Sequence, residues 1–228
     1  MNDNSTPYRA ADYDRDVIAT IPFYSKFHAE AIDLVKTVRP DVTVWLDTGC
    51  GTGYLVEQAL PAFPAARFLL ADPAASMLER AKARLSRFPS ERLRFLAPLR
   101  SQELAVTVCE VPQVISAIQS HHYGDEEARR QATRACHNLL ESGGIYVTFE
   151  NFRPATPKGI ETALERWLRF QSTADRSSKT VEEHRLRFDR NYFPITIAEH
   201  LKLLRDTGFT TAEIFWLSHM QAGFYAIK

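Results

Sequence analysis

Val44-Trp45-Leu46-Asp47-Thr48-Gly49-Cys50-Gly51-Thr52-Gly53 decides the fold of this 228-residue chain, because an apolar run passes into a turn where three glycines alternate with small residues. Glycine adopts positive φ readily and lets a ligand approach the backbone closely. The Tyr54-Leu55-Val56 segment after the turn has the pattern of a helix start, whose free N–H groups face the turn. Asp47, at the carboxyl end of the strand, places an acceptor beside those donors. The stretch therefore predicts a strand, a ligand-binding turn and a helix.

A second apolar run, Arg67-Phe68-Leu69-Leu70-Ala71, precedes an acidic residue. This acid, Asp72, lies about 20 residues beyond the last glycine, where doubly wound folds hold the ribose of a nucleoside. The glycines follow a G-x-G-x-G pattern, and Tyr54 stands where a dinucleotide fingerprint carries its last glycine. The pattern therefore indicates a smaller nucleoside and opposes a nicotinamide-dependent oxidoreductase.

With these motifs the chain resembles the class I S-adenosylmethionine-dependent methyltransferases, whose first motif is similar to Leu46 through Gly53. Further similarity lies in Ala71-Asp72-Pro73 with Ser76-Met77-Leu78, in Val114-Ile115-Ser116-Ala117 followed by His121-His122-Tyr123, and in Leu139 to Gly144 running into Ile145-Tyr146-Val147-Thr148. The resemblance covers residues 42–149 and, more loosely, the C-terminal hairpin.

The resemblance implies that S-adenosylmethionine is the cofactor, that the glycine turn packs against its methionine part, and that Asp72 binds both ribose hydroxyls. The cofactor-binding residues expected are Asp47, Gly49, Cys50, Gly51, Gly53, Asp72, Pro73, Met77, Pro98, Leu99, Ser116 and Tyr13. The chain departs from the family pattern in two places. Residues 95–100 hold no acid for the adenine amino group, which leaves backbone groups, Gln102 or Glu103, and Gln113 stands where an acid is frequent.

Apolar strand-like runs alternate with helix-period segments, which indicates parallel strands joined by helical crossovers. Strands are expected at 44–48, up to 71, 93–96, 111–117, up to 149, 211–217 and 223–227, and helices after 53, over 76–85, 126–140 and 197–207. The short join Ser218-His219-Met220-Gln221 requires an antiparallel pair. We therefore predict an α/β fold with a Rossmann-like, doubly wound, seven-stranded sheet, mostly parallel with a C-terminal antiparallel hairpin.

A single domain is expected over residues 1–228, since domains hold about 100–200 residues and larger single units occur. Residues 1–40 carry the apolar spacing of helices that pack on the sheet. Pro154 and Pro157 open a stretch over 151–193 with two charged amphipathic segments, around Trp167 and Arg185. We interpret this stretch as an inserted helical cover.

The composition argues against nucleic acid and membrane partners. Lys plus Arg and Asp plus Glu both number 28, so no net field favours a polyanion. Cys50, Cys109 and Cys136 lack C-x-x-C spacing, which suits a reducing compartment, and Met1–Asp16 has no apolar run. Ser116-Ala117-Ile118-Gln119 also lacks the Asn or Asp, two prolines and aromatic of exocyclic-amine DNA methyltransferases. We expect a cytoplasmic monomer or homodimer that acts on a small molecule.

Methyl transfer from a sulfonium is an in-line displacement, in which holding the acceptor about 3 Å from the methyl carbon supplies much of the catalysis. The crevice between strands one and four is the expected place, because strand order reverses there. His121 and His122, just past strand four, are the catalytic candidates, since imidazole titrates near neutral pH. Alternatively they cap the helix at Glu126 or pack on the rim. Adjacent histidines without nearby carboxylates have poor metal spacing, so no metal is expected.

Several aromatic and basic side chains are open to two interpretations. Aromatic residues face the sulfonium or an apolar acceptor, or they belong to the core: Tyr8, Tyr13, Phe23, Tyr24, Trp167, Tyr192 and Phe193. Arg185 and Arg187 clamp an acidic substrate or lie on a solvated helix face. The predicted function is methyl transfer from S-adenosylmethionine to the O, N, S or C atom of a small molecule. The alternative is a non-catalytic S-adenosylmethionine- or S-adenosylhomocysteine-binding or scaffold protein that retains the fold.

Overall fold

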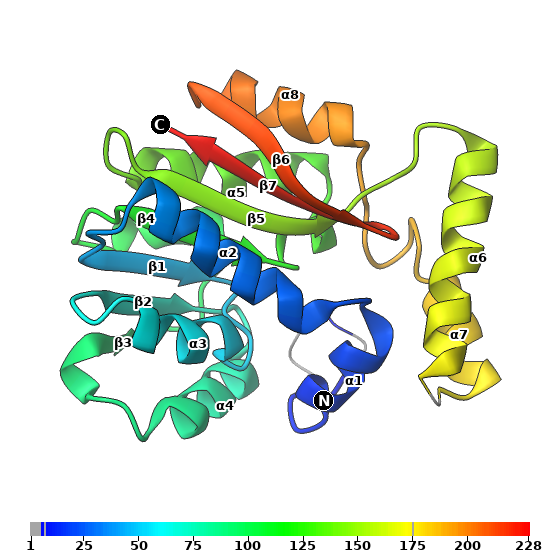
Figure 1. The fold of residues 1–228 in the computed structure, drawn as a ribbon, viewed down its shortest axis with the longest axis horizontal. Helices are drawn as coiled ribbons and strands as arrows, with labels where there is room; N and C mark the ends of the chain where they lie inside the picture. Colours follow the sequence, from blue (N-terminus) through cyan, green and yellow to red (C-terminus); the bar gives the residue numbers. More distant parts are fainter. Residues whose placement is uncertain (1–5, 7, 175) are drawn as a thin grey trace.

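A mixed seven-stranded sheet forms the centre of the computed structural model, which describes residues 6, 8–174 and 176–228 (Figure 1). Its strands are β1 (Val44–Thr48), β2 (Arg67–Ala71), β3 (Leu93–Phe95), β4 (Val114–Ile118), β5 (Ile145–Asn151), β6 (Thr211–Ser218) and β7 (Gln221–Ile227). Their order is β3-β2-β1-β4-β5-β7-β6, with parallel pairing from β3 to β5 and antiparallel pairing of β7 with β5 and β6. This is the predicted α/β sheet, and strand order reverses between β1 and β4.

Helices cover both faces of the sheet (Figure 1). They are α1 (Tyr13–Thr20), α2 (Tyr24–Val38), α3 (Tyr54–Ala62), α4 (Ala75–Leu85), α5 (Glu126–Leu139), α6 (Pro157–Thr173), α7 (Ser178–Arg185) and α8 (Ile197–Thr207). One core lies between the sheet and α2, α3 and α4, and the other lies between the sheet and α5 and α8. Neighbouring residues of β1 serve opposite cores, with Trp45 in the first and Leu46 in the second. A parallel strand covered on both faces is therefore mainly apolar, as β1 is from Val44 to Leu46 before Asp47 and Thr48 at its carboxyl end.

Two predicted boundaries need correction. β4 begins at Val114 and not at Val111, because Pro112 has no N–H for the ladder and Val111 is 61% exposed. The join between β6 and β7 is shorter than predicted, since both strands extend and leave only His219 and Met220 between them. The extension of β5 to Asn151 brings Glu150 into the sheet, where it pairs with Ala222.

α6 and α7 lie beyond the end of β5, to one side of the sheet (Figure 1). The two helices occupy the stretch interpreted as a helical cover. Trp167 of α6 is fully buried, and its indole N–H donates to the carbonyl of Thr20 at 2.6 Å, which ties α6 to the end of α1. Trp167, Tyr192 and Met220 form a small apolar cluster at this end of the molecule.

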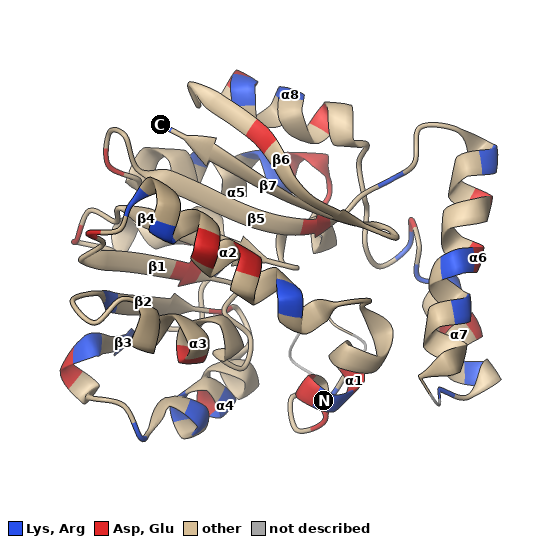
Figure 2. Ribbon diagram, in the orientation of Figure 1, with Lys and Arg blue, Asp and Glu red and all other residues tan. Residues whose placement is uncertain are grey.

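Acidic and basic residues are interspersed over the helices (Figure 2). None of the helices in the described part of the chain is long and apolar enough to cross a membrane.

Candidate cofactor and acceptor site

A cavity lies against the glycine turn at the carboxyl ends of β1, β2 and β4. We call this cavity the cradle. It is lined by Thr6, Tyr13, Gly49, Gly51, Asp72, Pro73, Met77, Ile118, Gln119, Ser120 and Tyr123. Its space outside atoms, open solvent at the mouth included, is about 470 Å³. The structure thus brings together Tyr13, Gly49, Gly51, Asp72, Pro73 and Met77 of the expected cofactor residues.

Two glycines of the turn face the cradle for different reasons. Gly49 has a φ of +67°, and a Cβ there would lie 2.3 Å from the Ser120 hydroxyl oxygen, so the turn and the loop after β4 touch at this point. Gly51 has a φ of +54°, and no atom lies within 4 Å of the position its Cβ would take. The backbone at Gly51 is therefore open to a ligand, as the expected cofactor requires.

Asp72 is held in the cradle by backbone donors. Its Oδ2 accepts from the N–H of Gly51 at 2.9 Å, and its Oδ1 accepts from the N–H of Ala74 at 2.9 Å. These two bonds, one to each oxygen, fix the orientation of the carboxylate. A fixed carboxylate beside an open glycine backbone fits the ribose of an adenosyl group.

Other expected cofactor residues support the turn instead of lining the cradle. A Cβ on Gly53 would lie 3.2 Å from Ala81 and Leu85, so this glycine lets α4 pack closely. Cys50 is buried, its N–H donates to the carbonyl of Ala71 at 2.9 Å, and burial raises the pKa of its thiol. Pro98 and Leu99 are also absent from the lining.

Asp47 lies beneath the turn and is buried. Burial raises the pKa of its carboxyl to about 7, and the charge of Asp72 acts in the same direction. The Ser116 hydroxyl donates to Asp47 Oδ1 at 2.5 Å, which opposes that rise, and the same hydroxyl oxygen accepts from the Trp45 indole at 2.8 Å. Asp47 and Ser116 therefore brace β1 against β4 below the cradle.

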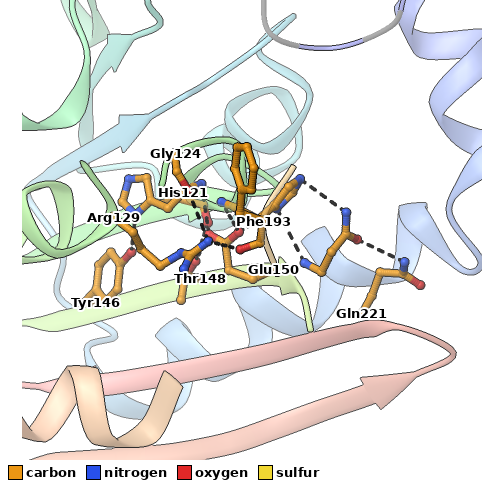
Figure 3. Close-up of polar contacts among 11 residues, drawn as sticks. His121, Gly124, Arg129, Tyr146, Thr148, Glu150, Phe193 and Gln221 are labelled. Carbon is orange, nitrogen blue, oxygen red and sulfur yellow. Dashed lines mark hydrogen bonds and ion pairs between the residues drawn. The ribbon is translucent and has the colours of Figure 1, made fainter. Parts of the chain in front are cut away.

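His121 and His122 are both buried and belong to a polar group around Glu150. Figure 3 shows His121, Thr148 and Glu150 of this group. We call Thr148, Glu150, Asn151, His121, His122 and Gln221 the Glu150 cluster. The Glu150 carboxylate accepts from the N–H of His121 at 3.1 Å and of His122 at 2.9 Å, from His122 Nδ1 at 2.6 Å and from Thr148 Oγ1 at 2.9 Å. Burial alone would raise the pKa of Glu150, but the hydrogen bond and charge of His122 lower it to about 2.

Both histidine rings have partners on each nitrogen. His122 Nε2 lies 3.3 Å from Asn151 Nδ2, and Asn151 Oδ1 accepts from Gln221 Nε2 at 3.1 Å. His121 Nε2 lies 2.8 Å from the Ser101 hydroxyl, and its Nδ1 lies 3.1 Å from the Tyr146 hydroxyl. Burial lowers the pKa of His121. Neither ring lines the cradle, and a proton-transfer role for either stays a prediction.

The cluster continues into the loop after β4. Arg129 donates to the carbonyls of Gly124 and Phe193 (Figure 3), and the N–H of Phe193 donates to the carbonyl of His122 at 2.7 Å. Among the described residues, no group of three or more His, Cys, Asp or Glu is arranged to hold a metal ion.

A second cavity lies between the cradle and the helices α1, α6 and α7. We call it the inner cavity. It is lined by Tyr8, Tyr13, Val17, Thr20, Ile21, Gln119, Tyr123, Asn151, Trp167, His184, Arg187 and Tyr192. Tyr13, Gln119 and Tyr123 line both spaces, so a molecule in the inner cavity would adjoin one in the cradle. A roomier space outside it, the vestibule, shares Tyr8, His184 and Arg187 with the inner cavity.

Gln119 is a site residue that sequence reasoning missed. It follows β4 directly and has a φ of +54°, a conformation that is strained for a residue other than glycine. Its N–H donates to the carbonyl of Phe149 at 2.7 Å, which holds it there. Its place after the fourth strand was the available signal, because ligands gather at the carboxyl ends of strands beside the switch point.

The comparisons with known proteins agree with this geometry. Residues 46–146 match a family model described as a methyltransferase domain. The matched domain and the structural neighbours support a class I S-adenosylmethionine-dependent methyltransferase family for this chain. The matched range contains β1, the glycine turn, Asp72 and the loop after β4.

Relatives of this methyltransferase differ in the length they share with it. It is 23% identical over 225 residues to carboxy-S-adenosyl-L-methionine synthase of Trichodesmium erythraeum, covering 95% of this chain and 85% of that protein. A putative O-methyltransferase from Nostoc punctiforme has a TM-score of 0.66 at 18% identity, over 90% of this chain and 56% of that one. Human N-acetylserotonin methyltransferase, in complex with S-adenosylmethionine, has a TM-score of 0.62 at 11% identity. The match covers 90% of this chain and 52% of the human protein. The chain thus spans little more than half of these two structures, whose likeness shows the shared fold.

Proposed function

We propose that this methyltransferase binds S-adenosylmethionine in the cradle and transfers its methyl group to a small molecule held in the inner cavity. The observation that carries the proposal is the wall that both spaces share. Tyr13, Gln119 and Tyr123 line each of them, so a cofactor and an acceptor would meet there.

The residues of the cradle have distinct roles in this proposal. Asp72 accepts hydrogen bonds from the ribose hydroxyls, and the open backbone at Gly51 contacts the ligand. Pro73 and Met77 supply apolar contact. Bound S-adenosylmethionine supplies an electrophilic methyl group on a sulfonium.

The chain contributes chiefly by positioning and by excluding water. Burial raises the pKa of the Tyr13 and Tyr123 phenols, so both keep their protons at neutral pH and orient an acceptor without deprotonating it. In this proposal His121 and His122 are positioning residues, which hold the loop of Gln119 and Tyr123 through the Glu150 cluster. Accurate placement can supply much of the rate of an in-line transfer.

Two glycines of the same backbone type give a matched test. Gly51 and Gly143 both have positive φ and no atom within 4 Å of a built Cβ, but Gly143 precedes β5 at the opposite end of the sheet. Gly51→Val is expected to abolish binding of S-adenosylhomocysteine in calorimetry, whereas Gly143→Val retains it. Equal binding by the two variants would place the ligand elsewhere. Methyl transfer from labelled S-adenosylmethionine to a panel of metabolites then tests the reaction.

A second candidate function is modification of the cofactor itself. It is favoured by the alignment with carboxy-S-adenosyl-L-methionine synthase, which covers 95% of this chain, cover helices included. Mass spectrometry separates the two reactions. Methyl transfer yields S-adenosylhomocysteine and a methylated acceptor, whereas the second reaction needs an added carboxyl donor and yields a carboxylated S-adenosylmethionine and the decarboxylated donor.

A further inference from the structure

Three buried polar side chains of the inner cavity have no hydrogen-bond partner among the described residues. They are Gln119 at its Nε2, Tyr192 at its hydroxyl and His184 at both ring nitrogens. Their exposed fractions are 7%, 2% and 8%. They come from the loop after β4, from α7 and from the segment before α8, yet all three line one space.

Such groups are costly to bury unpaired, so a cluster of them in one lining points to a bound molecule that supplies partners. Gln119 Nε2 and the Tyr192 hydroxyl are donors. Burial, with the charges of Arg176 and Arg187, lowers the pKa of His184 to about 3, so its neutral ring offers one donor and one acceptor. Donors are in excess, and the matching ligand is rich in acceptor oxygens.

One arginine lies in the described lining of the inner cavity. Arg187 lines it, and the described lining includes no Asp, Glu or Lys. Arg185, two residues earlier, is exposed and pairs through Nε and Nη2 with Glu182 at 2.8 and 2.7 Å. The structure therefore separates two arginines that the sequence left equivalent, and Arg187 is the one beside the unpaired groups.

The walls of the inner cavity are largely aromatic. Five aromatic side chains line it: Tyr8, Tyr13, Tyr123, Trp167 and Tyr192. Trp167 and Tyr192 meet edge to face with centroids 6.4 Å apart, as do Tyr8 and Tyr13 at 6.2 Å. Aromatic rings bind a further ring by stacked or edge-on contact.

We propose that the methyl acceptor is a small aromatic carboxylate. Its ring lies among the five aromatic side chains, its carboxylate lies beside Arg187, and its remaining polar groups meet Gln119, Tyr192 and His184. It enters through the vestibule, whose space outside atoms is about 880 Å³. This inference rests on the proposed function, because it names the acceptor class of the same site.

The test uses 4-hydroxybenzoate as the probe, with 4-hydroxybenzamide as its neutral isostere and acetate as the anion without a ring. Calorimetry on the full chain loaded with S-adenosylhomocysteine is expected to show 4-hydroxybenzoate binding about tenfold more tightly than the amide, since a buried charge-assisted pair contributes about that factor. Acetate is expected to bind weakly, because it cannot use the aromatic walls.

Variants of the two arginines identify the group responsible. Arg187→Gln removes the preference for 4-hydroxybenzoate over the amide, whereas Arg185→Gln keeps it. Arg187→Lys retains the charge without the planar fork and keeps part of the preference. If Arg187→Gln fails to fold, Arg187→Lys tests the same prediction in its place.

The outcomes separate this inference from the proposed function. If S-adenosylhomocysteine binds but the acid binds no more tightly than the amide, or both arginine variants act alike, the acceptor class is wrong and the methyltransferase proposal stands. If S-adenosylhomocysteine does not bind, the proposed function is wrong. In that case, the protein without S-adenosylhomocysteine can still be tested with the two probes. If it binds 4-hydroxybenzoate more tightly than 4-hydroxybenzamide, and Arg187→Gln removes the difference, the inner cavity binds aromatic carboxylates.

Discussion

The Glu150 cluster and the inner cavity are two buried polar regions at the same end of the sheet, and they differ in how their groups are paired. Both carboxylate oxygens of Glu150 and all four ring nitrogens of His121 and His122 have partners. In the inner cavity, Gln119 Nε2, the Tyr192 hydroxyl and both nitrogens of His184 have none among the described residues. The residue types are alike, and the pairing differs.

This difference distinguishes a structural network from a site that awaits a ligand. A buried network rigidifies the chain around it where its groups are paired, and here the paired carboxylate and imidazoles fix the loop of Gln119 and Tyr123. Within the Glu150 cluster, Gln221 Oε1 is the exception, since it has no partner among the described residues. An unpaired group keeps its hydrogen-bonding capacity for a bound molecule, at a cost to stability. His122 and His184 are both buried, so burial does not distinguish them. Their hydrogen bonds do, because the ring nitrogens of His122 have partners and those of His184 have none among the described residues.

Removing the centre of the paired region is expected to have the largest effect on stability. Glu150→Ala leaves the His122 ring and two backbone N–H groups without their acceptor, so the free energy of unfolding falls by about 3–5 kcal/mol. Urea denaturation measures it. Glu127→Ala is the control, because that exposed carboxylate pairs locally with Arg130 and its loss is expected to change stability little. Similar losses for both variants would mean that the cluster is not a structural network.

The two regions are expected to lose stability over different ranges of pH. His184 has a folded pKa of about 3 against 6.5 for an ordinary histidine, so the unfolded chain binds more protons between these values. Its contribution is complete above pH 6.5 and is lost as the pH falls, by about 1.4 kcal/mol per pH unit. Glu150, with a folded pKa of about 2 against 4.5, loses its contribution only below pH 4.5.

His184→Phe is therefore expected to flatten the stability curve between pH 6.5 and 4.5 by about one proton, close to 3 kcal/mol over the interval. Urea midpoints taken every half unit of pH measure the slope. Tyr192→Phe, in the same cavity, is the control that leaves the slope unchanged, since burial raises the pKa of that phenol away from this range. An unchanged slope in His184→Phe would show that the ring is solvated and does not face a dry cavity.

Two buried tyrosines give the most direct test of pairing. The Tyr146 hydroxyl contacts His121 Nδ1, whereas the Tyr192 hydroxyl has no partner within the described chain. Tyr146→Phe is expected to lower the free energy of unfolding by about 1–2 kcal/mol, because it leaves a ring nitrogen unpaired. Tyr192→Phe removes an unpaired hydroxyl and raises stability by up to about 1 kcal/mol. Thermal and urea unfolding compare the two, and equal losses would mean that the Tyr192 hydroxyl is paired in solution.

The sequence was sufficient for the sheet and for part of the cradle. Apolar runs that end in Gly49 or Asp72 place those residues at strand ends, whatever the side chains do elsewhere. The sequence did not predict the direction in which each residue faces. Gly51 and Gly53 stand in one motif, yet the first opens on the cradle and the second packs against α4.

The two regions themselves depend on contacts between distant residues. His122 and Glu150 are 28 residues apart in the chain, and their pairing follows from the adjacency of β4 and β5. Arg185 and Arg187 have the same amphipathic surroundings in sequence, so only the packing of α7 shows which one lines the cavity. The apolar pattern of the sequence therefore predicts helices and strands well, but it predicts side-chain hydrogen bonds between distant residues poorly.

Gln119 gives the smallest expected change in stability and the finest test of the comparison. Its φ of +54° costs about 1 kcal/mol in a residue with a Cβ, and its Nε2 is unpaired, so the fold carries two small penalties at one position. Gln119→Gly should raise the free energy of unfolding by about 1 kcal/mol while it weakens binding of the acceptor, which loses a donor. Asp189, one of three other described non-glycine residues with positive φ, provides the control, because it lies outside the lining of the inner cavity and Asp189→Gly should leave acceptor binding intact. Stability that rises together with acceptor affinity would mean that the strain at Gln119 serves no ligand, and the inner cavity would then differ from the Glu150 cluster only in being less well packed.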